Sequence, residues 1–227
     1  GRGSRAPTVT EAYGYYLNNT FDQYDYIGNP RLKNESAIEV NGTFRFSLPT
    51  FNFTIDANAF FFSNYIIGQF ERRLSAMTVD AEGVKVYGNI AHATIANAQL
   101  STGWQIQPWL TWNTNLAYSI GRDDEGDVLP MISPISWQSE LQYQNQHFQA
   151  QAVVKGNTRQ SNYGEKYGET PASEWAIINL SAQYRFSSFV VRAGIENLLD
   201  KYYATYADWN HIPQKGRNIY MNLTFAL

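Results

Sequence analysis

The sequence has no cysteine among its 227 residues, and charged residues make up only 16% of it. Without cysteine the chain can form no disulfide, no thiolate metal site and no thiol nucleophile. The charged share lies well below the usual quarter, and the net charge of −3 gives no basic surface for nucleic acid. Long apolar runs are also absent, since none approaches the roughly 18 residues of a membrane-spanning helix.

Aromatic residues, by contrast, are abundant at 15%, and they take part in a period-two alternation of apolar and polar residues. In 218–227 every odd-numbered residue is apolar, and most even-numbered residues are polar. Such alternation gives a β-strand one apolar and one polar face. The pattern predicts the end of a strand in 1–7, followed by nine complete strands near 35–48, 51–59, 84–104, 110–118, 135–143, 148–155, 176–186, 189–196 and 218–227.

The connections between these strands are expected to alternate in length. Tight turns are expected near 49–50, 107–108, 145–146 and 187–188, and long connections in 8–33, 63–83, 121–133, 156–174 and 197–216. Short turns at one end and long loops at the other are typical of outer-membrane β-barrels, whose tilted strands need roughly 9–11 residues to cross the bilayer. The polar faces are rich in Asn, Gln, Ser and Thr, which suits a wet lumen.

The sequence therefore predicts an all-β fold, a transmembrane antiparallel β-barrel. A soluble β-sandwich is the alternative, but its strands should be shorter, at about five or six residues. In a sandwich the apolar faces of two sheets would meet in a dry interior, whereas in a membrane barrel they face lipid.

Three segments resemble sequence boxes of the TonB-dependent outer-membrane receptors. Residues 3–7, Gly-Ser-Arg-Ala-Pro, resemble the family's Phe-Arg-Ala-Pro box. Residues 29–35, Asn-Pro-Arg-Leu-Lys-Asn-Glu, resemble its Asn-Pro-x-Leu-x-x-Glu box, and 195–203 followed by 216–220 resembles its C-terminal signature. Leu227 departs from the family, which usually ends in an aromatic residue.

The resemblance implies that residues 1–227 are the C-terminal portion of a plugged barrel of roughly 22 strands. The plug and the earlier strands would then lie outside this chain. The implied function is energised import, across the outer membrane of a Gram-negative cell, of a scarce ligand such as a ferric siderophore, cobalamin or another metal complex. The implied partners are outer-membrane lipid and lipopolysaccharide, the plug and remaining strands, TonB, and a small metal-chelate ligand, without nucleic acid.

Two other functions are compatible with a barrel. One is a passive porin, and the other is a surface protein or complex subunit that does not transport. A plug-sized domain with a TonB box would favour import over both. None of these functions is enzymatic or requires a cofactor, and no catalytic or metal-binding constellation is apparent around His92, His147 or His211.

The expected outer loops carry the residues best suited to hold a ligand. Aromatic rings at a barrel mouth can stack on a flat ligand and supply polar donors, and paired guanidinium groups can hold an anionic chelate. Equally, the rings can serve loop packing, and the guanidinium groups can bind lipopolysaccharide phosphates or face water. The candidate ligand-binding residues are Tyr13, Tyr15, Tyr16, Arg72, Arg73, Tyr202, Tyr206, Trp209 and His211.

One loop has an acidic cluster. Asp123, Asp124, Glu125 and Asp127 resemble a fragment of a calcium-binding loop, but their spacing does not complete one. We therefore expect a solvated acidic loop there.

Overall fold

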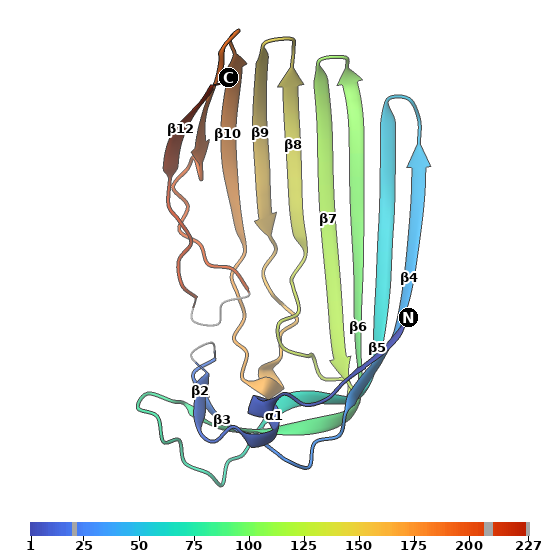
Figure 1. The fold of residues 1–227 in the computed structure, drawn as a ribbon, viewed down its shortest axis with the longest axis vertical. Helices are drawn as coiled ribbons and strands as arrows, with labels where there is room; N and C mark the ends of the chain where they lie inside the picture. Colours follow the sequence, from blue (N-terminus) through green and yellow to red (C-terminus); the bar gives the residue numbers. More distant parts are fainter. Residues whose placement is uncertain (20–21, 207–210, 226–227) are drawn as a thin grey trace.

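The computed structural model describes residues 1–19, 22–206 and 211–225. Within these ranges the chain forms one twelve-stranded sheet, whose main path runs through β1 and then β4 to β12 in chain order. Figure 1 shows these strands side by side in a curved, open sheet. The strands of this path are β1 (Arg2–Arg5), β4 (Glu35–Ser47), β5 (Phe51–Phe70), β6 (Gly83–Gln107), β7 (Leu110–Asp123), β8 (Ser136–Gln144), β9 (Phe148–Asn157), β10 (Trp175–Arg185), β11 (Phe189–Glu196) and β12 (Asn218–Phe225).

The nine predicted strands after the first loop are confirmed, and each pairs antiparallel with the next. Short turns join them at one end of the sheet, and the long connections gather at the other (Figure 1). We call this second end the loop end. It also contains η1 (Glu165–Tyr167), a single turn of 3-10 helix.

β5 is longer than the sequence predicted. Its residues 65–70 pair with 85–90 of β6, so the strand continues to Phe70 and the connection begins only at Glu71. The alternation fades along this extension, which is why the pattern suggested a loop beginning at residue 63.

The predicted loop 8–33 also contains regular structure, namely α1 (Val9–Tyr13), β2 (Leu17–Asn19) and β3 (Tyr24–Ile27). α1 begins at a capping box, in which Glu11 N–H donates to the Thr8 hydroxyl at 3.2 Å and the Thr8 N–H donates to the Glu11 carboxylate at 2.7 Å. β3 pairs in parallel with the start of β6 and joins this segment to the sheet.

No helix in the described part of the chain is long and apolar enough to cross a membrane.

The register aligns most apolar residues of neighbouring strands in rows on one face. One row runs through Phe44, Ile55, Leu100 and Leu116, and these side chains stay exposed or half-buried. The adjacent row on the opposite face contains Thr43, Asp56, Gln99 and Ala117. Because no second sheet covers the apolar face among the described residues, the β-sandwich alternative is wrong and the open part of a barrel is the observed architecture.

The buried hydrophobic core lies at the loop end, on the polar face. Its members are Ile90, Ala93, Leu129, Ile132 and Tyr167. Ala93 belongs to the polar-face row that also contains Phe62 and Asp123, so the loops fold over that face. The polar face is therefore the inner face of the barrel wall, and the apolar face is the outer one.

Candidate functional site

A cavity of about 320 Å³ lies at the loop end, between the segment before β10 and the loop after β11. It includes two residues that the sequence predicted, Tyr202 and His211. Its lining consists of Pro171, Ala172, Ser173, Glu174, Trp175, Lys201, Tyr202, Tyr203, Ala204 and His211. We call it the mouth cavity. Its volume falls within the usual range of small-molecule sites, roughly 300–1,000 Å³.

Aromatic rings form one side of the mouth cavity. The rings of Trp175 and Tyr203 lie 4.4 Å apart at an interplanar angle of 33°. Burial, and then the negative charge of Glu196, raises the pKa of the Tyr203 phenol, which therefore stays a neutral hydroxyl at neutral pH. Tyr202 is 76% exposed and leaves its ring available. These rings provide flat surfaces against which a planar ligand can stack.

The imidazole of His211 adds a polar group. Its Nε2 lies 3.2 Å from the Thr170 hydroxyl, which leaves Nδ1 as a further donor or acceptor according to the tautomer. Lys201 and Glu174 bring one charge of each sign to the same lining. The cavity therefore combines aromatic surface with a few polar groups. In the described ranges, no group of three His, Asp or Glu side chains is arranged to hold a metal ion.

The wall of the mouth cavity before β10 is held by a buried polar network. The Glu169 carboxylate accepts hydrogen bonds from Met131 N–H at 3.0 Å, from Gln160 Nε2 at 3.1 Å and from Gly164 N–H. The Gln160 side-chain oxygen accepts from Ala172 N–H at 3.2 Å, and Ala172 lines the cavity. Glu169 and Gln160 are only 3% and 1% exposed, so this network positions the wall from beneath.

A second set of contacts clamps the same wall to the acidic loop. Lys166 Nζ lies 2.9 Å from Asp123 Oδ2, 2.6 Å from Glu125 Oε2 and 2.8 Å from Asp127 Oδ2. Burial pulls the pKa of Lys166 down, but the hydrogen bonds to Asp127, Glu125 and Asp123 outweigh it and raise the pKa above the usual lysine value. The Tyr167 hydroxyl also donates to Asp123 Oδ2, at 2.7 Å. We call Lys166 and its three carboxylates the lysine clamp.

The expectation of a solvated acidic loop is therefore wrong for Asp123, which is 7% exposed, although Asp124 is exposed. The ammonium group of Lys166, more than 40 residues away in the sequence, occupies the place between the carboxylates. Only the folding of one loop onto another brings these charges together, so local spacing did not reveal the partner.

The N-terminal candidates lie elsewhere at the loop end and do not line the mouth cavity. Tyr13 and Tyr15 are each 72% exposed, and the ring of Tyr16 meets that of Tyr15 edge-on at 5.0 Å. Arg72 is exposed, whereas Arg73 binds Glu71 with two hydrogen bonds of 2.9 Å. These bonds lower the pKa of Glu71 to about 2 and occupy part of the guanidinium group.

Tyr206 is half-buried and does not line the mouth cavity, and Trp209 lies outside the described residues. The sequence analysis missed Trp175, Tyr203, Lys201 and Glu174. Trp175 gave one signal, since it is a large aromatic residue on the polar face of its strand, where small polar residues predominate.

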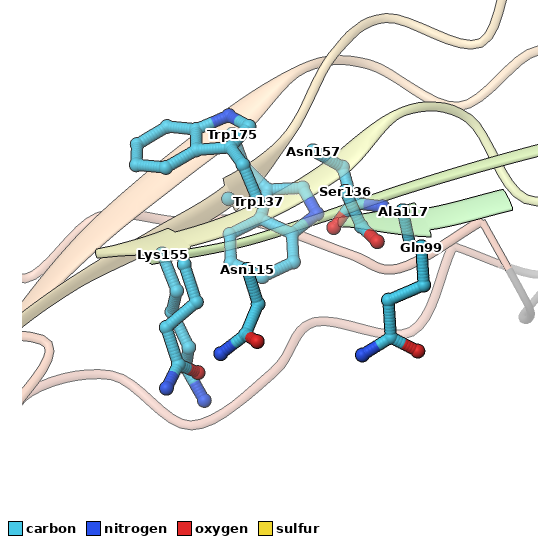
Figure 2. Close-up of a pocket in the computed structure, with 10 residues that line it drawn as sticks. Gln99, Asn115, Ala117, Ser136, Trp137, Lys155, Asn157 and Trp175 are labelled. Carbon is cyan, nitrogen blue, oxygen red and sulfur yellow. The ribbon is translucent and has the colours of Figure 1, made fainter. Parts of the chain in front are cut away.

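A second cavity, of about 290 Å³, lies on the inner face of the sheet, and Trp175 lines both this cavity and the mouth cavity. Figure 2 shows the side chains of Gln99, Asn115 and Lys155 extending to the same side of the sheet. The register explains the cluster, because Asn115 pairs with Gln138, and Gln138 with Lys155. A wall of amides with one ammonium group thus continues inward from the mouth cavity.

The family model described as "TonB dependent receptor-like, beta-barrel" matches residues 1–198. No curated protein matches the sequence. Among solved structures, the copper transporter OprC superposes with a TM-score of 0.82 at 16% identity over 99% of this chain and 36% of its own.

Two siderophore-related structures also superpose over 99% of the chain. A mutant of the ferric enterobactin receptor PfeA from Pseudomonas aeruginosa gives a TM-score of 0.73 at 20% identity, covering 37% of that protein. The siderophore receptor PirA from Acinetobacter baumannii gives 0.71 at 16% identity, covering 38%. The chain thus spans little more than a third of these proteins, and the likeness at such identity concerns the fold.

Proposed function

The chain belongs to the family of TonB-dependent receptor-like β-barrels, and from this premise we propose that it takes part in the energised import of a scarce metal chelate across the outer membrane. The mouth cavity captures the ligand, and the amide-lined inner face offers it a path inward. The observation that carries the proposal is that one side chain, Trp175, lines both cavities.

The lining of the mouth cavity supports a flat or aromatic metal complex as the ligand. Trp175, Tyr202 and Tyr203 offer ring faces, while His211 and Lys201 offer a polar donor and a positive charge. A ferric siderophore, cobalamin and a copper complex all combine planar groups with polar atoms. The solved relatives are described as a copper transporter, a ferric enterobactin receptor and a siderophore receptor, which is the same range of ligand chemistry.

The inner wall supports passage rather than tight capture. Its amides, at Gln99, Asn115 and Gln138, can each exchange one weak hydrogen bond for another as a ligand moves. No covalent step is needed. In this proposal the driving force comes from TonB acting on a plug that lies in the lumen, and both of these, with the remaining barrel strands, are partners outside this chain.

The outer apolar face supports a position in the outer membrane. Exposed Trp104 and Trp112 lie 6.3 Å apart near the turns, where aromatic residues anchor a barrel at the membrane interface. Lipid and lipopolysaccharide are therefore the proposed surroundings of this face. The loop end then faces the outside, and the turns face the periplasm.

Binding of candidate ligands to the purified protein tests the capture site. Ferric enterobactin, cobalamin and cupric ion would be titrated by tryptophan fluorescence. Trp175→Ala and Tyr202→Ala should each weaken binding of the true ligand about tenfold, because stacked rings contribute on the order of 1 kcal/mol beyond their burial. Tyr15→Ala is the matched control, since that ring is equally exposed but lies outside the cavity. Equal affinities in all variants would remove the mouth cavity from the function.

Uptake by cells tests the energised part. Import of the bound ligand should stop when TonB is deleted or the proton gradient is collapsed. Uptake that continues unchanged would favour the passive porin, and binding without uptake would favour the surface protein or complex subunit.

A further inference from the structure

The strands β4, β5, β6 and β7 lie side by side in the sheet (Figure 1). The outer face of the wall has a hollow over these strands. Two neighbouring rows of small residues form its floor. Gly42, Ala57 and Ala98 make one row, and Ala59 and Ala96 belong to the other. The hollow measures about 490 Å³, and Val40, Tyr118 and Ile120 rise at its sides.

Larger side chains bound the hollow along the strands. The row nearer the turns contains Phe44, Ile55, Leu100 and Leu116. The row nearer the loop end pairs Phe61 with Thr94 and Thr94 with Arg122. The depression is thus bordered by apolar side chains toward the turns, and toward the loop end by Phe61 on β5, Thr94 on β6 and the polar Arg122 on β7.

Arg122 supplies a positive charge at the border of the hollow nearer the loop end. It belongs to the outer face, because the next residue, Asp123, is buried on the inner face in the lysine clamp. Its Nη1 donates to the Gly126 carbonyl at 2.9 Å, which fixes the guanidinium group while leaving other N–H donors. Among the described residues no carboxylate forms an ion pair with it. The exposed His92 lies in the next row, paired with Ser63.

The position of Arg122 along β7 places it in the headgroup layer. Ten residues separate it from Trp112 at the turn end, which corresponds to about 33 Å along the strand. With a strand tilt of about 35–45°, the vertical separation is roughly 25 Å, the height of the apolar band of such barrels. The hollow lies within this band, because its lining residue Ile120 is two positions nearer the turns than Arg122 on β7.

We propose that this outer face binds a phosphate-bearing lipid of the leaflet at the loop end, with the phosphate on Arg122 and an acyl chain in the hollow. Guanidinium groups bind phosphate oxygens through paired, charge-assisted hydrogen bonds. The apolar depression directly below is the complementary surface for a hydrocarbon chain. In the outer membrane the lipid of this chemistry is lipopolysaccharide. The proposal rests on the proposed membrane position and not on the import ligand.

Lipid retained by the purified protein tests the proposal. The intact protein would be extracted from outer membranes in mild detergent, and bound phosphorylated lipid would be counted by native mass spectrometry. Arg122→Gln should lower lipid occupancy about tenfold, as expected for the loss of a charge-assisted phosphate contact. Ala96→Leu fills the hollow and should lower occupancy as well.

Two matched controls separate the site from general effects. Ala182→Leu places the same side chain on the outer face of β10, away from the hollow, and Arg159→Gln removes a charge from an exposed loop. Both should retain the lipid, and all variants should keep the shift in gel mobility that heating produces in folded barrels. Unchanged occupancy in either Arg122→Gln or Ala96→Leu would overturn the proposal. A lipid-free dimer that Ala96→Leu dissociates would also overturn it, because the occupant would then be a second copy. Ligand binding at the mouth cavity would persist in either case.

Discussion

Two regions at the loop end border the mouth cavity, and they are held in different ways. The first region consists of the two loops on either side of β8 and β9, within residues 124–174. It is held by buried Leu129, Ile132 and Tyr167, by the Glu169 network and by the lysine clamp. In the loop after β11, where the structure describes residues 197–206 and 211–217, Asn197 anchors the base. There the Asn197 amide donates to the carbonyl oxygens of Lys201 and Lys215, at 2.8 and 3.2 Å.

The two regions also differ in how far their apolar side chains are buried. Leu199, Tyr202 and Ile212 are 69%, 76% and 59% exposed, whereas Leu129 is fully buried. A segment with few buried contacts opens at a low free-energy cost. Among the described residues, one wall of the mouth cavity therefore rests on a buried core, whereas Leu199 and Tyr202 on the facing wall are mostly exposed.

The largest effect is expected from Glu169→Ala. Three donors, the buried ones of Gly164 and Gln160 and the part-buried N–H of Met131, would lose this acceptor, which should lower the free energy of local opening by about 3–5 kcal/mol. Hydrogen exchange of the Met131 amide measures this. Glu165→Ala, an exposed change in the same segment, is the control. If exchange in 197–217 accelerated as much as at Met131, the two walls would not be independent.

Asn197→Gly should cause a smaller loss of local stability than Glu169→Ala, and the loss should appear in the other wall of the mouth cavity. Asn197 has a φ of +50°, which glycine adopts without strain, so the variant removes only the side-chain amide. Loss of its buried hydrogen bonds should cost about 2–3 kcal/mol, seen as faster exchange at Lys201 and not at Met131. Asn162→Gly, in an exposed position, should change neither. Faster exchange confined to Met131 would reverse the assignment of the two walls.

Lys166→Met should have a weaker effect than Glu169→Ala on the same wall. The Lys166 side chain is 38% exposed, so solvent screens its charge, and Asp123 keeps the hydrogen bonds from Tyr167 and from its own loop. We expect a loss of about 1–2 kcal/mol in local stability, measured by exchange at Gly126. Lys215→Met in the terminal loop is the control. A loss as large as that of Glu169→Ala would show that the lysine clamp, and not the Glu169 network, is the main support of this wall.

The smallest effect concerns a third loop, 71–82, in which the buried carboxylate of Asp25 binds two backbone N–H groups. Asp25 Oδ2 accepts from Met77 N–H at 2.7 Å and from Thr78 N–H at 2.9 Å. Burial alone would raise the pKa of Asp25, but hydrogen bonds, first from Thr78 and then from Met77, lower it below the usual value. A lowered pKa contributes stability above the unfolded value of about 3.9, and this stability is lost as the pH falls through the folded value.

Pepsin cleavage between pH 4 and pH 2 measures this loss. Wild-type protein should resist cleavage in 71–82 better than Asp25→Asn at pH 4, and the difference should vanish toward pH 2. A constant ratio across this range would show that the Asp25 carboxylate does not hold the loop.

The order and facing of the strands could be predicted from the sequence because they depend on local backbone geometry. A strand has a side-chain period of two, so Ile219, Met221 and Leu223 share a face whatever surrounds them. The alternation of turns and loops follows from the same pattern. Even so, α1 was missed although Thr8 and Glu11 form a recognisable capping box, because the surrounding residues lack a helical period.

The candidate site was predicted only in part. Tyr202 and His211 were identified as mouth residues because aromatic loops of this kind suit ligands, and the structure places both in one cavity. Tyr13, Tyr15 and Arg72 were chosen because their side chains also suit a ligand, but they do not line this cavity. The amino-acid types in a loop indicate which side chains are able to bind a ligand, but they do not determine which loops come together in the fold.

The sequence by itself determined a wall with one apolar and one polar face, since that property repeats every two residues. Only the tertiary structure decided which distant residues share a site. Lys166 meets Asp123, and Trp175 stacks on Tyr203, because closure of the long connections brings together positions 28 to 43 residues apart. Such contacts depend on the register of whole strands and on the burial of the loop core, and neither leaves a local pattern in the chain.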